Sequence, residues 1–127
     1  MSVGLLIISH DDVGASLLHA ATSMLGMCPL HVALVTVHRV DDPDFILSQA
    51  QRRLQEVDAG EGVLVLTDMF GSTPSNVAAR LRDWGDIRVI AGLNLPMLVR
   101  ILNYPRLSLD ELTRKAVEGG RDGILSW

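Results

Sequence analysis

The stretch LLIISHDDVG, residues 5–14, passes from an apolar run to the start of a helical pattern. Its first residues are all leucine and isoleucine, a composition typical of a strand that is covered on both faces. After the polar residues at 9–12, apolar side chains recur at helical spacing from Val13 to Leu25, and Gly26 is a typical stop signal. The stretch therefore predicts a buried strand followed directly by a helix.

The alternation of strand and helix continues along the rest of the chain. Further apolar runs predict strands at 32–37, 63–67, 87–91 and, more weakly, 123–127. Helical patterns lie between them, beginning at Pro43 after the candidate cap Asp42, near Pro74, at Leu95, and after Ser108. Such alternation predicts a single α/β domain over 1–127, a three-layer α/β/α sandwich around a mostly parallel sheet.

Composition excludes several classes of protein. The net charge is −4 and no basic run is longer than Arg52-Arg53, so a nucleic-acid partner is not expected. No apolar stretch approaches the roughly 20 residues of a membrane span, and the first residues lack the charged start of a signal peptide. The single cysteine, Cys28, cannot form an internal disulfide, which favours a reducing, cytoplasmic location.

Candidate functional residues follow three of the predicted strands. In open α/β sheets, ligands bind at the carboxyl ends of the strands. The first strand, predicted over 3–9, ends in SHDD (9–12), which contains His10; the third ends in TDMFGSTPSN (67–76), and the fourth ends in AGLNLPM (91–97). These loops supply an imidazole, the carboxylate of Asp68, and several hydroxyl groups. The helix after Pro74 would point its N-terminus at the same crevice, which favours an anion.

An imidazole, a carboxylate and an anion-binding loop are the groups that phosphoryl chemistry on a histidine needs. One ring nitrogen must be free as the nucleophile, while a carboxylate bonded to the other nitrogen fixes the tautomer. A helix N-terminus near the ring would keep it neutral. His10 and Asp68 can act together only if the first and third strands lie close in the sheet. Each residue also has a structural interpretation, as a strand end or a helix cap.

A metal site made by His10, Asp11 and Asp12 is an alternative use of the same stretch. Adjacent residues project in different directions, and no second histidine stands at helical spacing from His10. We therefore expect no metal and no other cofactor.

Four segments together resemble the mannose-type enzyme IIA components of the bacterial phosphoenolpyruvate-dependent sugar phosphotransferase system. They are GLLIISHDDVGASLLHAATSMLG, GVLVLTDMFGSTPSNVAARL, VIAGLNLPMLVRIL and AVEGGRDGI. The resemblance implies that His10 accepts a phosphoryl group on Nε2 from the phosphocarrier protein HPr and passes it to an enzyme IIB partner. It further implies that Asp68 supports Nδ1 and that Gly71, Ser72 and Thr73 hold the phosphoryl oxygens.

The resemblance also implies a homodimer in which the short C-terminal strand, antiparallel to its neighbour, is exchanged between subunits. Some relatives have glycine where this chain has Ser72, which adds a side chain to the phosphoryl-binding loop. The chain ends after the IIA segment, so we expect its phosphoryl acceptor to act in trans, either as an enzyme IIB or as a regulatory target.

Other functions remain open at this point. The phosphotransfer subunit of a dihydroxyacetone kinase system resembles the same sequence and carries a histidine at the same place. A receiver-like signalling module would use Asp68 as the phosphoacceptor, with Asp11 and Asp12 as a weak magnesium pair. It would also need a lysine after the last strand, whereas Lys115 lies in a helical pattern. A non-catalytic ligand-binding module is a third possibility.

Overall fold

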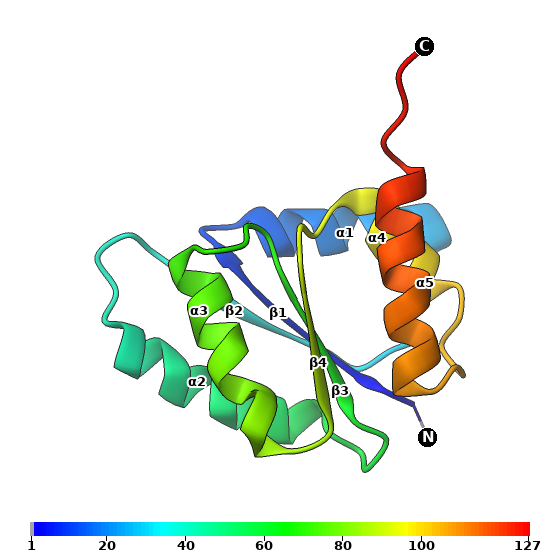
Figure 1. Ribbon diagram of the computed structural model, residues 1–127. Helices are drawn as coiled ribbons and strands as arrows, with labels where there is room; N and C mark the ends of the chain where they lie inside the picture. The colour runs from blue at the N-terminus through cyan, green and yellow to red at the C-terminus, as the bar shows by residue number, and fades with distance from the viewer. Residues whose placement is uncertain (1) are drawn as a thin grey trace.

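A four-stranded sheet with the strand order β2–β1–β3–β4 forms the centre of the molecule, described over residues 2–127 in a computed structural model (Figure 1). All strand pairs are parallel. The strands are β1 (Gly4–His10), β2 (Val32–Val37), β3 (Val63–Thr67) and β4 (Ile87–Ala91). The interior positions of β1 from Leu5 to Ile8 are fully buried, as their continuous apolar sequence predicted.

Helices cover both faces of the sheet (Figure 1). One apolar core joins the sheet to α1 (Val13–Leu25), α4 (Leu95–Leu102) and α5 (Leu109–Asp122). A second core joins the opposite face to α2 (Pro43–Val57) and α3 (Thr73–Arg80), which a short 3₁₀ turn follows. The predicted three-layer α/β/α sandwich with a parallel sheet is confirmed.

Local signals account for where several helices begin. Asp42 directly precedes Pro43, the first residue of α2. Its side chain accepts a hydrogen bond from the Asp44 N–H, so the predicted cap of α2 is present. Ser108 and Glu111 form the predicted capping box at the start of α5. These caps satisfy amide groups that the first turn of a helix leaves unpaired, which is why short polar side chains precede both helices.

The predicted final strand at 123–127 is not formed within this chain. Helix α5 ends at Asp122, and the residues after it extend away from the rest of the molecule as a tail (Figure 1). Ile124, Leu125 and Trp127 are largely exposed on this tail. Within residues 2–127, β4 pairs only with β3, so its outer edge has no partner strand. The apolar tail therefore lacks the neighbouring backbone that a strand requires.

A close contact fixes the junction between β1 and α1. Ser9 Oγ accepts a buried hydrogen bond from the Gly14 N–H at 2.9 Å. A Cβ atom on Gly14 would lie 2.6 Å from Ser9 Oγ and 2.7 Å from Ile7 Cγ2. The first turn of α1 can therefore sit against the strand only because residue 14 has no side chain.

The substitution Gly14→Ala is expected to destabilise the protein, because the added methyl group must displace buried atoms of β1. Overpacking of this kind costs about 1–3 kcal/mol of unfolding free energy. Urea denaturation followed by circular dichroism would measure the change. Ser16→Ala, at an exposed position of the same helix, is the control and should change the stability little. Equal stability of Gly14→Ala and the parent protein would contradict this account of the junction.

Candidate functional site

The pairing of β1 with β3 brings His10 and Asp68 together, although they lie 58 residues apart in the sequence. His10 is the last residue of β1, and Asp68 directly follows β3. Nδ1 of His10 lies 2.9 Å from Oδ2 of Asp68. The backbone N–H of His10 donates to the same oxygen at 3.0 Å. Asp68 Oδ2 thus holds both the ring and the backbone of His10.

The environment of Asp68 favours its ionised form. Burial by itself would raise the pKa of this carboxyl group, but the hydrogen bonds from the backbone N–H and the ring of His10 outweigh burial and hold the pKa below its usual value. A carboxylate can only accept hydrogen bonds, so the neutral ring carries its proton on Nδ1. Nε2 then keeps a free lone pair on a side chain that is 43% exposed.

The loop between β3 and α3 is shaped by hydrogen bonds among its own residues. Gly71 has a positive φ of 86°, which glycine adopts without strain. Its N–H donates to the buried Ser75 Oγ at 3.2 Å. The Ser72 hydroxyl donates to the Met69 carbonyl oxygen at 2.6 Å and makes no capping bond to α3. The hydroxyl group of Ser72 therefore stabilises the turn and does not cap the helix.

The first turn of α3 presents backbone donors beside this loop. The Asn76 N–H donates to the Ser72 carbonyl oxygen, and Pro74 has no N–H. Within residues 2–127, the amides of Thr73 and Ser75 have no acceptor in hydrogen-bond range. Free amides at a helix N-terminus are suited to bind an anion. Of the predicted phosphoryl-binding residues, Thr73 offers an amide at the start of the helix, whereas Gly71 and Ser72 shape the turn before it.

The loop after β4 has a structural role at the same edge of the sheet. The amides of Gly92 and Leu93 both donate to the Thr67 carbonyl oxygen at 3.0 Å, which ties this loop to the end of β3. Asn94 caps α4 and donates from its side chain to the Gly120 carbonyl oxygen at 3.1 Å. The GLNLP turn therefore holds α4 and α5 in place and adds no ionisable group to the site.

The receiver and metal alternatives gain no support from this geometry. Asp68 is engaged by His10 on Oδ2, and its Oδ1 is buried without a hydrogen-bond partner in the described part of the chain. Lys115 lies over the ring of Tyr104, with Nζ 4.9 Å from the ring centroid, as part of α5. No group of three or more histidine, cysteine or acidic side chains within residues 2–127 is arranged to hold a metal ion.

Sequence reasoning missed a second histidine–aspartate pair at this edge. Nδ1 of His38, directly after β2, lies 3.1 Å from Oδ1 of Asp11. Both side chains are largely exposed, at 60% and 72%. No local pattern assigns His38 a role, because its contact with Asp11 depends on β1 and β2 being neighbours in the sheet. Asp12, the residue after Asp11, occupies the cap position of α1.

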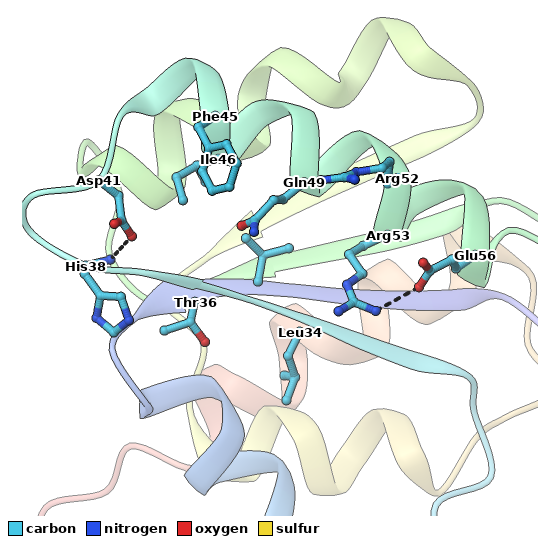
Figure 2. A pocket seen from close by; sticks show the side chains of 11 residues that line it. Leu34, Thr36, His38, Asp41, Phe45, Ile46, Gln49, Arg52, Arg53 and Glu56 are labelled. Atoms are coloured by element: carbon cyan, nitrogen blue, oxygen red, sulfur yellow. Dashed lines mark hydrogen bonds and ion pairs between the residues drawn. The ribbon is translucent and has the colours of Figure 1, made fainter.

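One groove of the molecule does not include His10 among the residues that line it. It has a volume of about 600 Å³ and runs between β2 and α2, with Leu34 and Thr36 on the strand and Gln49 and Arg53 on the helix (Figure 2).

Among residues 2–127, no helix combines the length and the apolar character needed to cross a membrane.

The carboxyl edge of this parallel sheet thus presents a histidine, an ionised carboxylate and a helix N-terminus, which defines an α/β protein with an anion-binding crevice beside an imidazole. A family model described as "PTS system fructose IIA component", named EIIA-man, matches residues 4–117. The chain belongs to this family of mannose-type enzyme IIA components of the sugar phosphotransferase system, as its sequence motifs predicted.

Individual relatives agree with this assignment. The "PTS system mannose-specific EIIAB component" of Escherichia coli K12 is 33% identical over 98% of this chain and 39% of its own length. The chain thus spans about two fifths of that relative. A putative phosphotransferase enzyme IIA component of the same organism, YadI, is 31% identical over 98% of this chain and 86% of its own length.

A solved structure shows the same fold. The mannose/sorbose-specific IIA subunit from Enterococcus faecalis superimposes with a TM-score of 0.88. The match covers 100% of this chain and 96% of the other, with 26% sequence identity.

Proposed function

We propose that this chain is a phosphocarrier that accepts a phosphoryl group from HPr on Nε2 of His10. The observation that carries the proposal is the 2.9 Å contact between His10 Nδ1 and Asp68 Oδ2. It leaves Nε2 unprotonated and exposed, as a nucleophile requires. The acceptor downstream is an enzyme IIB component or a regulatory target.

The proposed transfer moves one positive charge from the donor ring to the His10 ring. The Nε2 lone pair forms a bond to phosphorus as the bond between phosphorus and the ring nitrogen of the donor phosphohistidine breaks. The donor ring, which is protonated on its other nitrogen, keeps that electron pair and becomes neutral. The His10 ring, with a proton on Nδ1 and phosphorus on Nε2, then carries positive charge. Asp68 stabilises this charge through its hydrogen bond to Nδ1. The same contact supports transfer in both directions, since no net proton is gained or lost.

The phosphoryl oxygens are expected to meet the first turn of α3. The free amides of Thr73 and Ser75 and the hydroxyl of Thr73 provide donors there, and the helix dipole favours negative charge. Gly71 shapes the preceding turn through its left-handed conformation. Met69 and Phe70, exposed by 66% and 86% in the same loop, give protein partners an apolar surface beside the site.

The experiment that tests the function is reconstitution of the transfer. The protein is incubated with phosphoenolpyruvate, enzyme I and HPr, and the phosphorylated residue is mapped by mass spectrometry at neutral pH. Phosphate on His10 that depends on HPr supports the proposal. A phosphorylated chain that passes its phosphoryl group to a dihydroxyacetone kinase subunit carrying bound ADP, and not to an enzyme IIB, would identify the kinase system as its partner instead.

We further propose a cytoplasmic homodimer. The free and exposed Cys28 suits a reducing compartment. The tail after α5 carries Ile124, Leu125 and Trp127 into solvent, and β4 offers an unpaired edge. An exposed apolar tail and an open strand edge on the same chain are complementary surfaces for two copies.

Removing residues 124–127 is expected to convert the dimer to a monomer, because the segment proposed to pair with the partner's β4 is lost. Light scattering after size-exclusion chromatography would show the mass fall by half, while the circular dichroism spectrum stays unchanged. Cys28→Ser, which alters an exposed residue outside the tail, is the control. A full-length chain that is already monomeric at micromolar concentration would refute the proposed dimer.

A further inference from the structure

The carboxyl edge of the sheet carries a second imidazole held by a carboxylate. His38 Nδ1 contacts Asp11 Oδ1 at 3.1 Å, and the Asp11 N–H donates to the Val37 carbonyl oxygen at 3.0 Å. These bonds join the β1–α1 loop to the end of β2 by one side-chain and one backbone contact. Asp11 is the residue directly after His10, so the contacts act on the backbone next to the site.

The backbone of Asp11 has an unusual conformation. Its φ is 46°, and it is the single non-glycine residue with positive φ among the residues that the structure describes. Most side chains avoid this left-handed region, and aspartate is one of the few that tolerate it. Only Asp11 and Asp12 connect β1 to α1, so the chain must reverse sharply here. Strained residues of this kind persist where the surrounding contacts hold them.

The His38 side of the contact is itself anchored. The His38 N–H donates to Asp41 Oδ2 at 2.8 Å, and the Asp41 N–H donates to the His38 carbonyl oxygen at 3.0 Å. Figure 2 shows the first of these bonds, with the His38 ring turned away from α2 and toward the loop that leads into α1. The ring is therefore presented to Asp11 by a closed turn.

We propose that the Asp11–His38 pair positions His10 for phosphoryl transfer. The pair holds the reversed backbone after His10, and that backbone sets the direction of the His10 ring and N–H, both of which must reach Asp68 Oδ2. Neither Asp11 nor His38 contacts the transferred group in this proposal. Its kinetic consequence rests on the proposed function, whereas its effect on the His10 ring does not.

Substitutions can separate the backbone conformation of residue 11 from its side-chain contact. Asp11→Gly keeps the left-handed turn and removes the carboxylate, and His38→Ala removes the ring. Each is expected to slow single-turnover transfer from phosphorylated HPr about fivefold at saturating donor, the effect of losing one net hydrogen bond. The KM for HPr should change little, because the pair acts on the ring. Asp11→Asn, which keeps an acceptor oxygen and tolerates the turn, should restore the rate.

A double-mutant cycle and a spectrum of the unphosphorylated protein complete the test. The double variant Asp11→Gly, His38→Ala should be no slower than either single variant, since both remove one contact. Nitrogen-15 NMR of the His10 ring should show a single tautomer protonated on Nδ1 in the parent and a mixture in both single variants. His19→Ala, an exposed histidine on α1, is the matched control and should match the parent.

The outcomes distinguish this proposal from the function on which it rests. Unchanged NMR signals of the His10 ring in both single variants would overturn the positioning role, whatever the transfer rates are. Additive losses in the double variant would also overturn it, because the two residues would then act independently. A parent protein that accepts no phosphate from HPr would instead overturn the proposed function, and the NMR spectra would still decide the positioning role.

Discussion

His10→Ala is expected to abolish phosphorylation of the chain in the presence of phosphoenolpyruvate, enzyme I and HPr. Transfer should fall by at least about 1,000-fold, since removal of a nucleophile takes away the covalent step itself. The substitution should leave the fold intact, because the His10 side chain is 43% exposed and ends its strand. Radiolabelled phosphoenolpyruvate followed by gel autoradiography measures incorporation.

His31→Ala is the matched control for this loss. His31 is exposed, directly precedes β2, and should keep the parent rate of labelling. The stability of the label gives a second measurement, because phosphohistidine survives alkali and is lost in acid, whereas an acyl phosphate is labile in alkali. Labelling that persists in His10→Ala, or an alkali-labile product in the parent, would exclude His10 as the carrier and would point to Asp68.

Asp68→Asn is expected to slow transfer on the order of 100-fold while the domain remains folded. The amide can still accept the hydrogen bond from Nδ1, but it lacks the negative charge that stabilises the positively charged phosphorylated ring. Rapid-quench measurement of single turnovers at saturating HPr would record the change in rate. Asp68→Ala, which also removes the acceptor, should be slower still.

Asp68 also links stability to pH. Its pKa is lowered in the folded state, so it binds a proton more readily in the unfolded chain. Its contribution to the free energy of unfolding is therefore complete above the unfolded pKa of about 4 and is lost as pH falls through the lower folded value. In urea denaturation, the stability gap between parent and Asp68→Asn should narrow from pH 6 to pH 3. A gap that widens on acidification would contradict the ionised state assigned to Asp68.

The positions of most helices and strands were predictable because their signals are local. Continuous apolar runs marked β1 to β4, and proline with a short polar cap marked the start of α2. These patterns depend on residues a few positions apart, and the alternation they produce determines an α/β/α sandwich. The predicted strand at 123–127 is not formed in the single chain, because its apolar composition does not reveal where a neighbouring strand would come from.

By itself the sequence determined which side chains reach the carboxyl edge of the sheet. The strand ends at His10 and Thr67 place an imidazole and the carboxylate of Asp68 there, and Pro74 places a helix after them. Only the tertiary structure decided which of these groups meet. The order of parallel strands is set by packing between segments far apart in the chain, and several orders share the same local signals.

The two histidine–aspartate pairs illustrate this difference between local sequence and strand order. The β1–β3 pairing brings His10 to Asp68, and the β1–β2 pairing brings Asp11 to His38. A strand order in which β1 did not lie between β2 and β3 would separate at least one of these pairs without changing one residue of the sequence.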